Sequence, residues 1–169
     1  MEEWLDVYDE RHALTGRSVR RGEAVSGTDR LLAVHVCVLD GQNRLLIQHR
    51  HPQKDRYPGC WDLSAGGFAQ RGETSREAAL RELREELGIT LPAEELRFLF
   101  TEPFSRVLDD CYLARLAPKP EELRLQQEEV TEVRWVTWEE LLLLLRDGRF
   151  VDYPEAGLAK IFCLATKRK

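Results

Sequence analysis

Residues 67–89 read GFAQRGETSREAALRELREELGI, and this stretch predicts a helix with well-marked ends. Thr74 and Glu77 have the spacing of a capping box, so the helix is expected to begin near Ser75. Gly88 stands where a helix commonly ends with a left-handed residue. About four helical turns lie between these two signals.

The predicted helix has a hydrophobic face and an acidic face. Hydrophobic residues recur at spacings of three and four, at Ala79, Leu80, Leu83 and Leu87. A second face carries Ala78 and three carboxylates that one turn brings together, those of Glu82, Glu85 and Glu86. Arg81 lies four residues before Glu85 and can hold that side chain in place.

Three carboxylates on one helix face repel each other unless a cation lies among them. Hard oxygen ligands with room for water suit Mg²⁺ or Mn²⁺, which usually bridge to substrate phosphates. Gly66 and Gly67 precede the helix and allow backbone to approach a ligand. The alternative is a solvated helix rich in Glu and Arg, which is common on surfaces. The two glycines, with Glu73 at a fixed offset, favour the metal site.

The stretch resembles the Nudix box, G-x5-E-x7-R-E-U-x-E-E-x-G-U, in which U is aliphatic. Every specified position matches, at Gly67, Glu73, Arg81, Glu82, Leu83, Glu85, Glu86, Gly88 and Ile89. So many fixed positions in one short segment make the motif specific. The resemblance implies a Nudix hydrolase, which cleaves a diphosphate linked to another moiety, X, with a divalent metal ion.

Size and composition predict one globular domain over residues 1–169. A chain of 169 residues is long enough for a full hydrophobic core, and it is 43% hydrophobic and 33% charged. Its net charge of −5 argues against a nucleic acid polymer or an anionic membrane as partner. A small-molecule diphosphate substrate would therefore need metal and local Arg or Lys.

The cysteines and the chain start indicate a cytoplasmic protein. Cys37, Cys60, Cys111 and Cys163 are far apart and read as free thiols in a reducing compartment. The segment after Met1 is charged, so no signal peptide is visible. The aliphatic run 141–145 is too short to span a bilayer.

Strands alternate with helices along the chain, which predicts an α/β layered domain. Strands are expected at 4–8, 31–39, 44–49, 61–63, 65–68, 96–104, 107–116 and 130–136, and further helices after Thr137 and over 156–166. Residues 9–16 are expected to form a polar turn, and 167–169 a solvated tail. His35 is expected to be a packed or hydrogen-bonded core histidine. The resemblance specifies an α/β/α sandwich with a mixed central sheet, in which the box forms strand, loop and helix.

About half of the chain, residues 4–84, resembles the isopentenyl-diphosphate isomerase branch of the Nudix superfamily. The similarity includes DVYDE at 6–10, Thr15-Gly16, the central hairpin and PGCW at 58–61. In that branch basic residues bind the substrate diphosphate, and the matching positions are Arg20 (or its neighbour Arg21), Arg50, Lys54 and Arg81. Judged by charge alone, these residues fit a solvated surface equally well.

The chemistry of the isomerase does not carry over to this chain. Gly66 stands at the position of the catalytic cysteine, and Cys60 lies on the wrong side of Trp61 to replace it. Phe68 stands where the isomerase has a metal-binding histidine. The box is also complete here, whereas that of the isomerase is degenerate. Hydrolysis is therefore favoured over isomerisation.

The resemblance predicts roles for individual residues. Glu82, Glu85 and Glu86, with a backbone carbonyl of Gly66-Gly67, are expected to hold Mg²⁺ or Mn²⁺. Glu85 or Glu86, or an acid outside the box, is expected to take the proton of water. Arg81 is expected to orient the glutamates or contact phosphate, and Glu73 to brace the loop. Glu128 and Glu129 lie where some members supply a further acid.

Two other functions stay open at this point, an isomerase-type activity and a non-catalytic Nudix module that binds a diphosphate ligand. The moiety X is also open among nucleoside di- and triphosphates, nucleotide sugars, dinucleotides and prenyl diphosphates. Tyr8, Trp61 and Phe68 could stack on a base or belong to the core. A homodimer is an assembly that the family often adopts.

Overall fold

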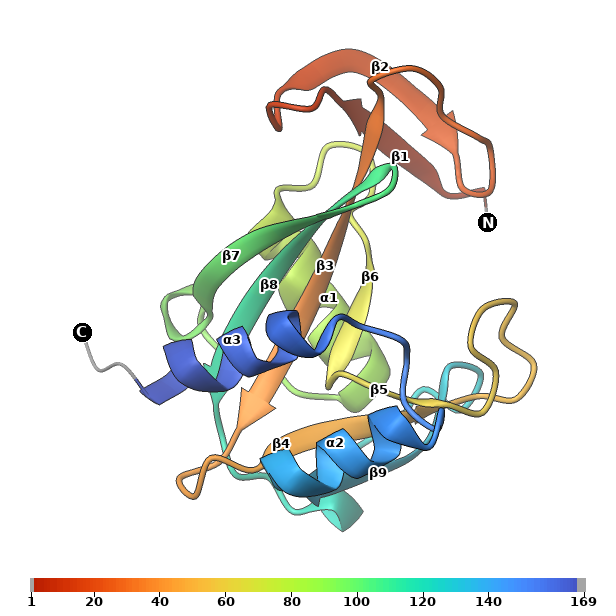
Figure 1. Cartoon of the computed structure of the whole chain (residues 1–169). Helices are drawn as coiled ribbons and strands as arrows, with labels where there is room; N and C mark the ends of the chain where they lie inside the picture. The colour runs from red at the N-terminus through yellow and green to blue at the C-terminus, as the bar shows by residue number, and fades with distance from the viewer. Residues whose placement is uncertain (1, 167–169) are drawn as a thin grey trace.

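The structure is a computed structural model that describes residues 2–166, so the predicted tail at 167–169 lies outside the described residues (Figure 1). Its strands are β1 (Trp4–Tyr8), β2 (Leu14–Arg20), β3 (Arg30–Leu39), β4 (Leu45–Arg50), β5 (Trp61–Asp62), β6 (Ala65–Phe68), β7 (Arg97–Phe104), β8 (Val107–Arg115) and β9 (Val130–Val136). Its helices are α1 (Ser75–Leu87), α2 (Trp138–Arg146) and α3 (Glu155–Thr166), with short 3₁₀ turns η1 (Ala93–Glu95) and η2 (Pro120–Glu122). The predicted α/β succession is confirmed. The predicted turn at 9–16 is wrong in its second part, because β2 begins at Leu14.

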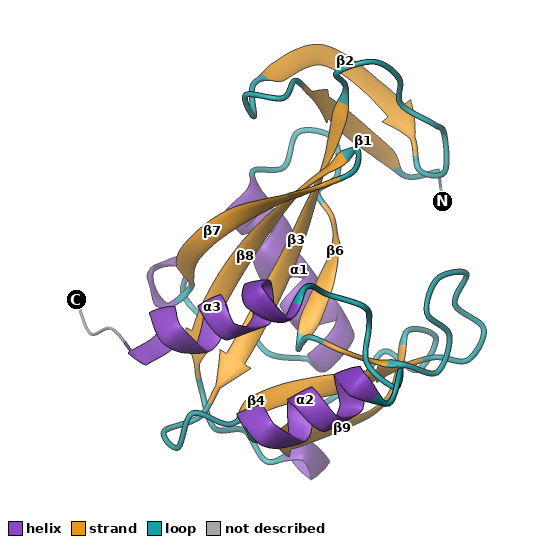
Figure 2. Cartoon of the chain, viewed as in Figure 1, coloured by secondary structure: helices purple, strands orange, loops and turns teal. Residues whose placement is uncertain are grey.

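Strand β3 is the centre of a mixed sheet. It pairs antiparallel with β1, β4 and β6 and parallel with β8, while β7 adds to β8 and β9 adds to β4. Helix α1 covers one face of the sheet and α3 crosses the other, with α2 packed near β4 and β9 (Figure 2). Within residues 2–166 no helix has the length and hydrophobicity needed to cross a membrane.

The hydrophobic run in β3 is continuous because both faces of this strand are covered. Leu32, Val34, Val36 and Val38 belong to the core beneath α1. Cys37 and Leu39 face the other way, into a second core with α2 and α3. Strand β3 therefore holds β6, and with it the start of the box, between two packed layers.

Helix α1 begins and ends where its sequence signals predict. The Thr74 side chain accepts a hydrogen bond from the Glu77 backbone N–H, and the Glu77 side chain bonds back to the Thr74 N–H. Gly88 ends the helix with φ 70°. One expectation is wrong: Ala78 is buried with the hydrophobic stripe, while Leu80 is only partly buried. The face that also carries Glu82 thus points into the protein rather than into solvent.

Replacing Gly88 by Ala is expected to destabilise the protein by about 1–2 kcal/mol. A side chain disfavours a φ of 70°, and the new Cβ would lie 2.9 Å from Arg124 Cβ. Urea denaturation followed by circular dichroism measures this loss. Gly41→Ala is the matched control, because Gly41 lacks a positive φ and its Cβ would meet nothing within 4 Å. Equal unfolding midpoints for the two variants would contradict the prediction.

Candidate active site

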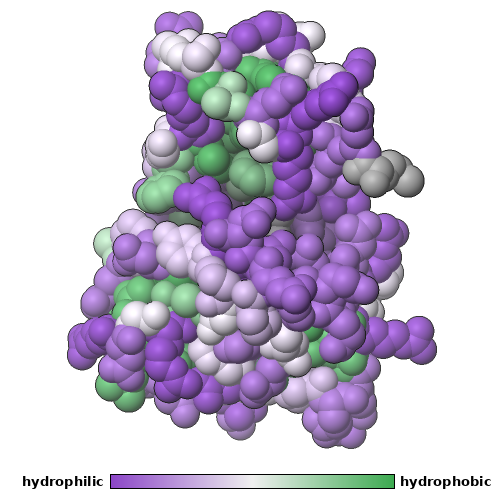
Figure 3. Space-filling view, turned by 90° about the vertical axis from the view of Figure 1, so that its right-hand side faces the viewer, coloured by the Kyte–Doolittle hydropathy of each residue, from purple (hydrophilic) through white to green (hydrophobic). Residues whose placement is uncertain are grey.

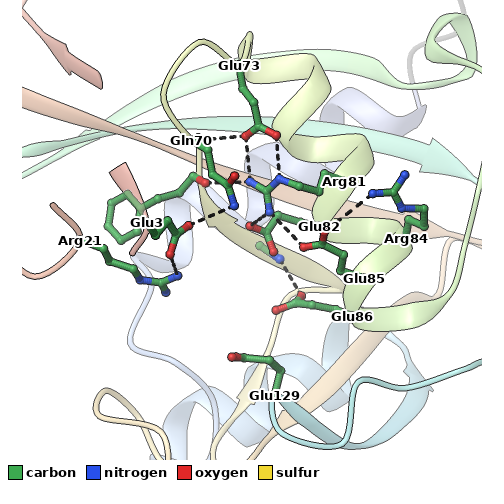
Figure 4. Close-up of polar contacts among 12 residues, drawn as sticks. Glu3, Arg21, Gln70, Glu73, Arg81, Glu82, Arg84, Glu85, Glu86 and Glu129 are labelled. Carbon is green, nitrogen blue, oxygen red and sulfur yellow. Dashed lines mark hydrogen bonds and ion pairs between the residues drawn. The ribbon is translucent and has the colours of Figure 1, made fainter. Parts of the chain in front are cut away.

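Strand β6 and helix α1 are in contact, so that the glycines of the strand meet the glutamates of the helix, whose side chains are shown in Figure 4. The buried Glu86 side chain is held by two donors on its Oε2 atom. The Gly66 backbone N–H donates at 3.0 Å and the Gln48 Nε2 at 3.1 Å. Glu86 thus has a fixed position between the sheet and the helix.

Both glycines are required by close contacts on opposite faces of β6. A Cβ at Gly67 would collide with the Glu82 carboxylate, on the α1 face. A Cβ at Gly66 would collide with the His35 ring and would lie 2.9 Å from the Val34 carbonyl oxygen. A cysteine at position 66 could not be accommodated without displacing His35.

The two glycine contacts predict different outcomes for Gly66→Ala and Gly67→Ala. The first variant presses on a ring and on backbone, so we expect a loss of about 1–3 kcal/mol in the free energy of unfolding. The second presses on the end of a flexible Glu82 side chain, so we expect smaller destabilisation but a loss of activity. Urea denaturation and initial rates test the pair. Equal effects of both variants on both measurements would be the contrary result.

Arg81 connects the acidic residues of the box. Its Nε and Nη2 donate to the two carboxylate oxygens of Glu73 at 2.7 and 2.9 Å. Its Nη1 donates to Glu82 Oε1 at 2.7 Å and to Glu85 Oε2 at 3.2 Å, and its Nη2 reaches the Phe68 carbonyl at 3.0 Å. All three nitrogens are engaged with the protein, so the structure supports Arg81 as an orienting residue and Glu73 as its brace.

The buried carboxylates lack full charge compensation. Burial raises the pKa of Glu82, although the neighbouring Arg81 charge lowers it in part. Burial, followed by the charge of Glu82, raises the pKa of Glu86 to about 8. Glu85 differs, because its side chain is 44% exposed. Two glutamates therefore destabilise each other's ionised forms at the site.

The donor set fits a divalent cation. Among residues 2–166, no three His, Cys, Asp or Glu side chains are already arranged as a ligand group. The Gln48 Oε1 atom, on the amide that donates to Glu86, is buried and has no hydrogen-bond partner. Buried carboxylates with raised pKa values and an unpaired amide oxygen are hard oxygen donors that a cation such as Mg²⁺ or Mn²⁺ would compensate.

Three of the predicted basic residues, Arg20, Arg50 and Lys54, form ion pairs with acids outside the box. Arg50 Nη1 donates to Asp62 Oδ2 at 2.8 Å, and Lys54 pairs with Glu129. Arg20 instead pairs with Glu2 at 3.0 Å and lies over the Trp4 ring. Arg20 is therefore held by the N-terminal strand rather than by the acidic site.

Arg21, the neighbour of Arg20, points toward the site. It pairs with Glu3 at 2.6 Å and lies 5.9 Å from the centre of the Phe68 ring (Figure 4). Burial lowers the pKa of Arg21, but Glu3 and the charges of Glu82 and Glu129 raise it overall. The structure thus favours Arg21 over Arg20 as the basic residue beside the glutamates.

Of the two additional acids, Glu129 lies near the site and Glu128 is exposed. The side of the molecule with the loop after β4 is largely hydrophilic (Figure 3).

Tyr8 and Trp61 are buried core residues, which leaves Phe68, beneath Arg21, as the partly exposed aromatic residue of the three.

Sequence reasoning missed several polar partners of the site. Gln48 and Asp62 are buried polar residues in short hydrophobic strands, and Glu3 lies near the chain start. A polar residue inside a hydrophobic strand was the available signal for Gln48. Tyr153 and Asp109, which lie behind β6, carried no motif.

Comparison with known proteins gives evidence on the family of this chain that does not depend on the geometry of the site. The NUDIX domain family matches residues 29–154. The Nudix hydrolase lmo0368 of Listeria monocytogenes is 42% identical over 153 residues, which are 90% of each chain, and the Nudix hydrolase YfcD of Escherichia coli is 36% identical over 82% of this chain and 76% of its own. The crystal structure of DR0079 from Deinococcus radiodurans superposes with a TM-score of 0.79 at 26% identity, covering 98% of this chain and 100% of that one.

Proposed function

This chain belongs to the Nudix hydrolase family and has its α/β fold, and from that premise we propose that it hydrolyses the diphosphate linkage of a small organic diphosphate with a divalent metal ion. One observation carries the proposal. Glu86 is buried, fixed by Gly66 and Gln48, and placed beside Glu82 so that its pKa rises to about 8. Such an arrangement is unfavourable unless a cation compensates it.

Mg²⁺ or Mn²⁺ would be held by Glu82, Glu85 and Glu86 with a carbonyl of Gly67. A bound divalent ion supplies stabilisation of the negative charge that develops on the diphosphate. The protein supplies orientation: Arg81 fixes Glu82 and Glu85 from one side, and Gly66 fixes Glu86 from the other.

Glu85 is the better placed of the two candidate bases. Its carboxylate is partly exposed and can exchange a proton with solvent, whereas Glu86 is enclosed and already accepts two hydrogen bonds. A base must lie within hydrogen-bond reach of its water and return to its ionised form after turnover. We therefore assign proton transfer to Glu85, beside its part in holding the metal, and metal binding alone to Glu86, with Glu129 as a further acid nearby.

Arg21, Arg50 and Lys54 would bind the substrate diphosphate. Each of them has a carboxylate partner in the structure, so substrate phosphate would exchange with or add to that partner. Arg81 is assigned an orienting role because it makes five hydrogen bonds to the protein, one for each of its N–H groups, whereas Arg50 makes three. The candidates for the moiety X are nucleoside di- and triphosphates, nucleotide sugars, dinucleotides and prenyl diphosphates.

An isomerase-type activity is disfavoured by the contact at Gly66. Isomerisation needs a proton donor at this position, and the His35 ring occupies the space that a side chain would need. The resemblance to the isomerase branch remains a prediction about scaffold and diphosphate binding. Deuterium exchange into isopentenyl diphosphate is the direct test of that alternative.

The proposed hydrolysis is tested with the purified full chain and a diphosphate library. We expect release of phosphate or of a nucleoside monophosphate with Mg²⁺ or Mn²⁺, no release with EDTA, and products identified by mass. The Glu85→Gln/Glu86→Gln double variant is the matched negative control. Tight ligand binding without turnover would instead support a non-catalytic module.

The remaining predictions concern the whole chain: one domain over residues 1–169, a cytoplasmic location and a homodimer. The four free cysteines support a reducing compartment. Size-exclusion chromatography with light scattering tests the assembly.

A further inference from the structure

A chain of polar side chains runs behind β6, on the face opposite α1. The Asp109 carboxylate lies 2.8 Å from His35 Nδ1, and His35 Nε2 lies 2.9 Å from the Tyr153 hydroxyl. The same hydroxyl lies 2.7 Å from Asp62 Oδ1, and Arg50 Nη1 lies 2.8 Å from Asp62 Oδ2. Four segments of the protein, β8, β3, the residues before α3 and β4–β5, thus meet in one network.

The direction of each hydrogen bond follows from the charge of His35. Burial lowers its pKa, but the charge and the hydrogen bond of Asp109 raise it to about 10. The imidazolium donates from both nitrogens, to Asp109 and to Tyr153. The Tyr153 hydroxyl therefore accepts from His35 and donates its one hydrogen to Asp62.

Asp62 is therefore held from several sides. It accepts hydrogen bonds from Tyr153, from the Leu63 backbone N–H at 2.8 Å and from Arg50. The Arg50 guanidinium is fixed further by the Arg56 carbonyl, to which Nε and Nη2 donate at 3.2 and 3.1 Å. The position of Arg50 thus depends on how firmly Asp62 is oriented.

The network ends beside the acidic site. Asp62 pairs across β4 and β5 with Gln48, whose side chain donates to Glu86 at 3.1 Å. The His35 ring packs against Gly66, whose N–H holds Glu86. Arg50 is the one member of this network to which the hydrolysis proposed above gives a role.

We infer that Tyr153, acting with His35 through Asp62, is a positioning residue that holds Arg50 in place to bind the substrate diphosphate. This inference rests on the proposed function, in which Arg50 is a diphosphate ligand. The alternative is a purely structural role, in which the network only satisfies the hydrogen bonds of the partly buried His35. The two roles differ in whether loss of the Tyr153 hydroxyl changes binding through Arg50.

The test is Tyr153→Phe, with Tyr112→Phe as the matched control. Tyr112 is also buried, and its hydroxyl bonds to Ser75 at 2.5 Å, on the α1 face. The probe is methylenediphosphonate, a diphosphate that cannot be hydrolysed, titrated calorimetrically with Mg²⁺. We expect Tyr153→Phe to weaken binding about three- to tenfold, the effect of one hydrogen bond, and Tyr112→Phe to leave it unchanged.

A double-mutant cycle separates positioning from general damage. In an Arg50→Met background, Tyr153→Phe should weaken binding no further. In the wild-type background and with a hydrolysable substrate, Tyr153→Phe should raise KM while kcat stays within about twofold. Equal weakening in both backgrounds, or a wild-type protein that does not bind the probe, would overturn the inference. Binding with the expected pattern but no hydrolysis would overturn the proposed function and leave the inference standing.

Discussion

Glu86→Gln is expected to lower hydrolysis at least about 100-fold and, in the metal-free protein, to increase stability above neutral pH. The first effect follows from loss of a charged ligand at the centre of the site. The second follows from burial, which together with Glu82 raises the pKa of Glu86 from 4.5 to about 8. A glutamine keeps the shape of the side chain and removes the buried charge.

The sign of the pH dependence is fixed by that pKa. The unfolded chain ionises this carboxyl near 4.5 and the folded chain near 8, so between these values the folded protein holds a proton that the unfolded chain has released. Stability of the wild type therefore falls as pH rises through this window. Glu86→Gln lacks this loss and should exceed the wild type by about 1–3 kcal/mol near pH 9.

Urea denaturation in EDTA at pH 5, 7 and 9 measures the difference. His35 also titrates toward high pH, with a pKa raised to about 10 mainly by Asp109 against the effect of burial, but it does so in both proteins and cancels. Glu121→Gln, at an exposed position in η2, should behave as the wild type. A Glu86→Gln variant whose stability parallels the wild type at every pH would show that Glu86 is ionised at no cost.

Features that depend on residues close together in the sequence, such as helix ends and helix faces, could be predicted. The limits of α1 follow from Thr74, Glu77 and Gly88, and the meeting of its glutamates follows from helical spacing. β2 was missed because most of its side chains are exposed and leave no hydrophobic alternation. Motif matching places the basic residue at Arg20 rather than Arg21, and sequence alone does not say which of two neighbouring side chains faces the site.

The residues behind β6 could not be predicted, for a different reason. Asp62 and Tyr153 lie far apart in the sequence and meet through pairing of distant segments, including the bridge between Trp61 and Phe150. His35 was correctly expected to be a hydrogen-bonded core histidine, but its partners come from β8 and from the residues before α3. Long-range contacts of single polar residues have no periodic signature that a sequence displays.

Arg81→Met is expected to be the most destabilising substitution in the box, by about 2–4 kcal/mol, and to abolish activity. Arg81 holds Glu73, Glu82 and Glu85 together, and Glu82 is buried. Without the guanidinium, three carboxylates face one another with no internal cation. Breaking a buried ion pair costs about 3–5 kcal/mol. We expect a value in or just below the lower part of that range, because the Glu85 and Glu73 side chains are partly exposed to water.

The pH dependence distinguishes lost charge pairing from lost packing at Arg81. Burial raises the pKa of Glu73, but hydrogen bonds and the charge of Arg81 lower it below its ordinary value overall. The stability from this pair is present above the ordinary glutamate pKa and disappears as pH falls through the lowered one. The destabilisation by Arg81→Met should therefore shrink in acid, as Glu73 takes up its proton and the pair loses its charge. Urea midpoints at pH 3 and pH 7 test this.

Two further variants make the result specific to Arg81. Arg84→Met removes a guanidinium that is 61% exposed and whose pair with Glu85 spans 3.7 Å, so it should change stability by less than about 0.5 kcal/mol. Arg81→Lys keeps the charge but cannot reach both Glu73 oxygens and Glu82 together, so it should recover stability better than activity. If Arg81→Lys restored both fully, a point charge would suffice, and the orienting role of the guanidinium would be refuted.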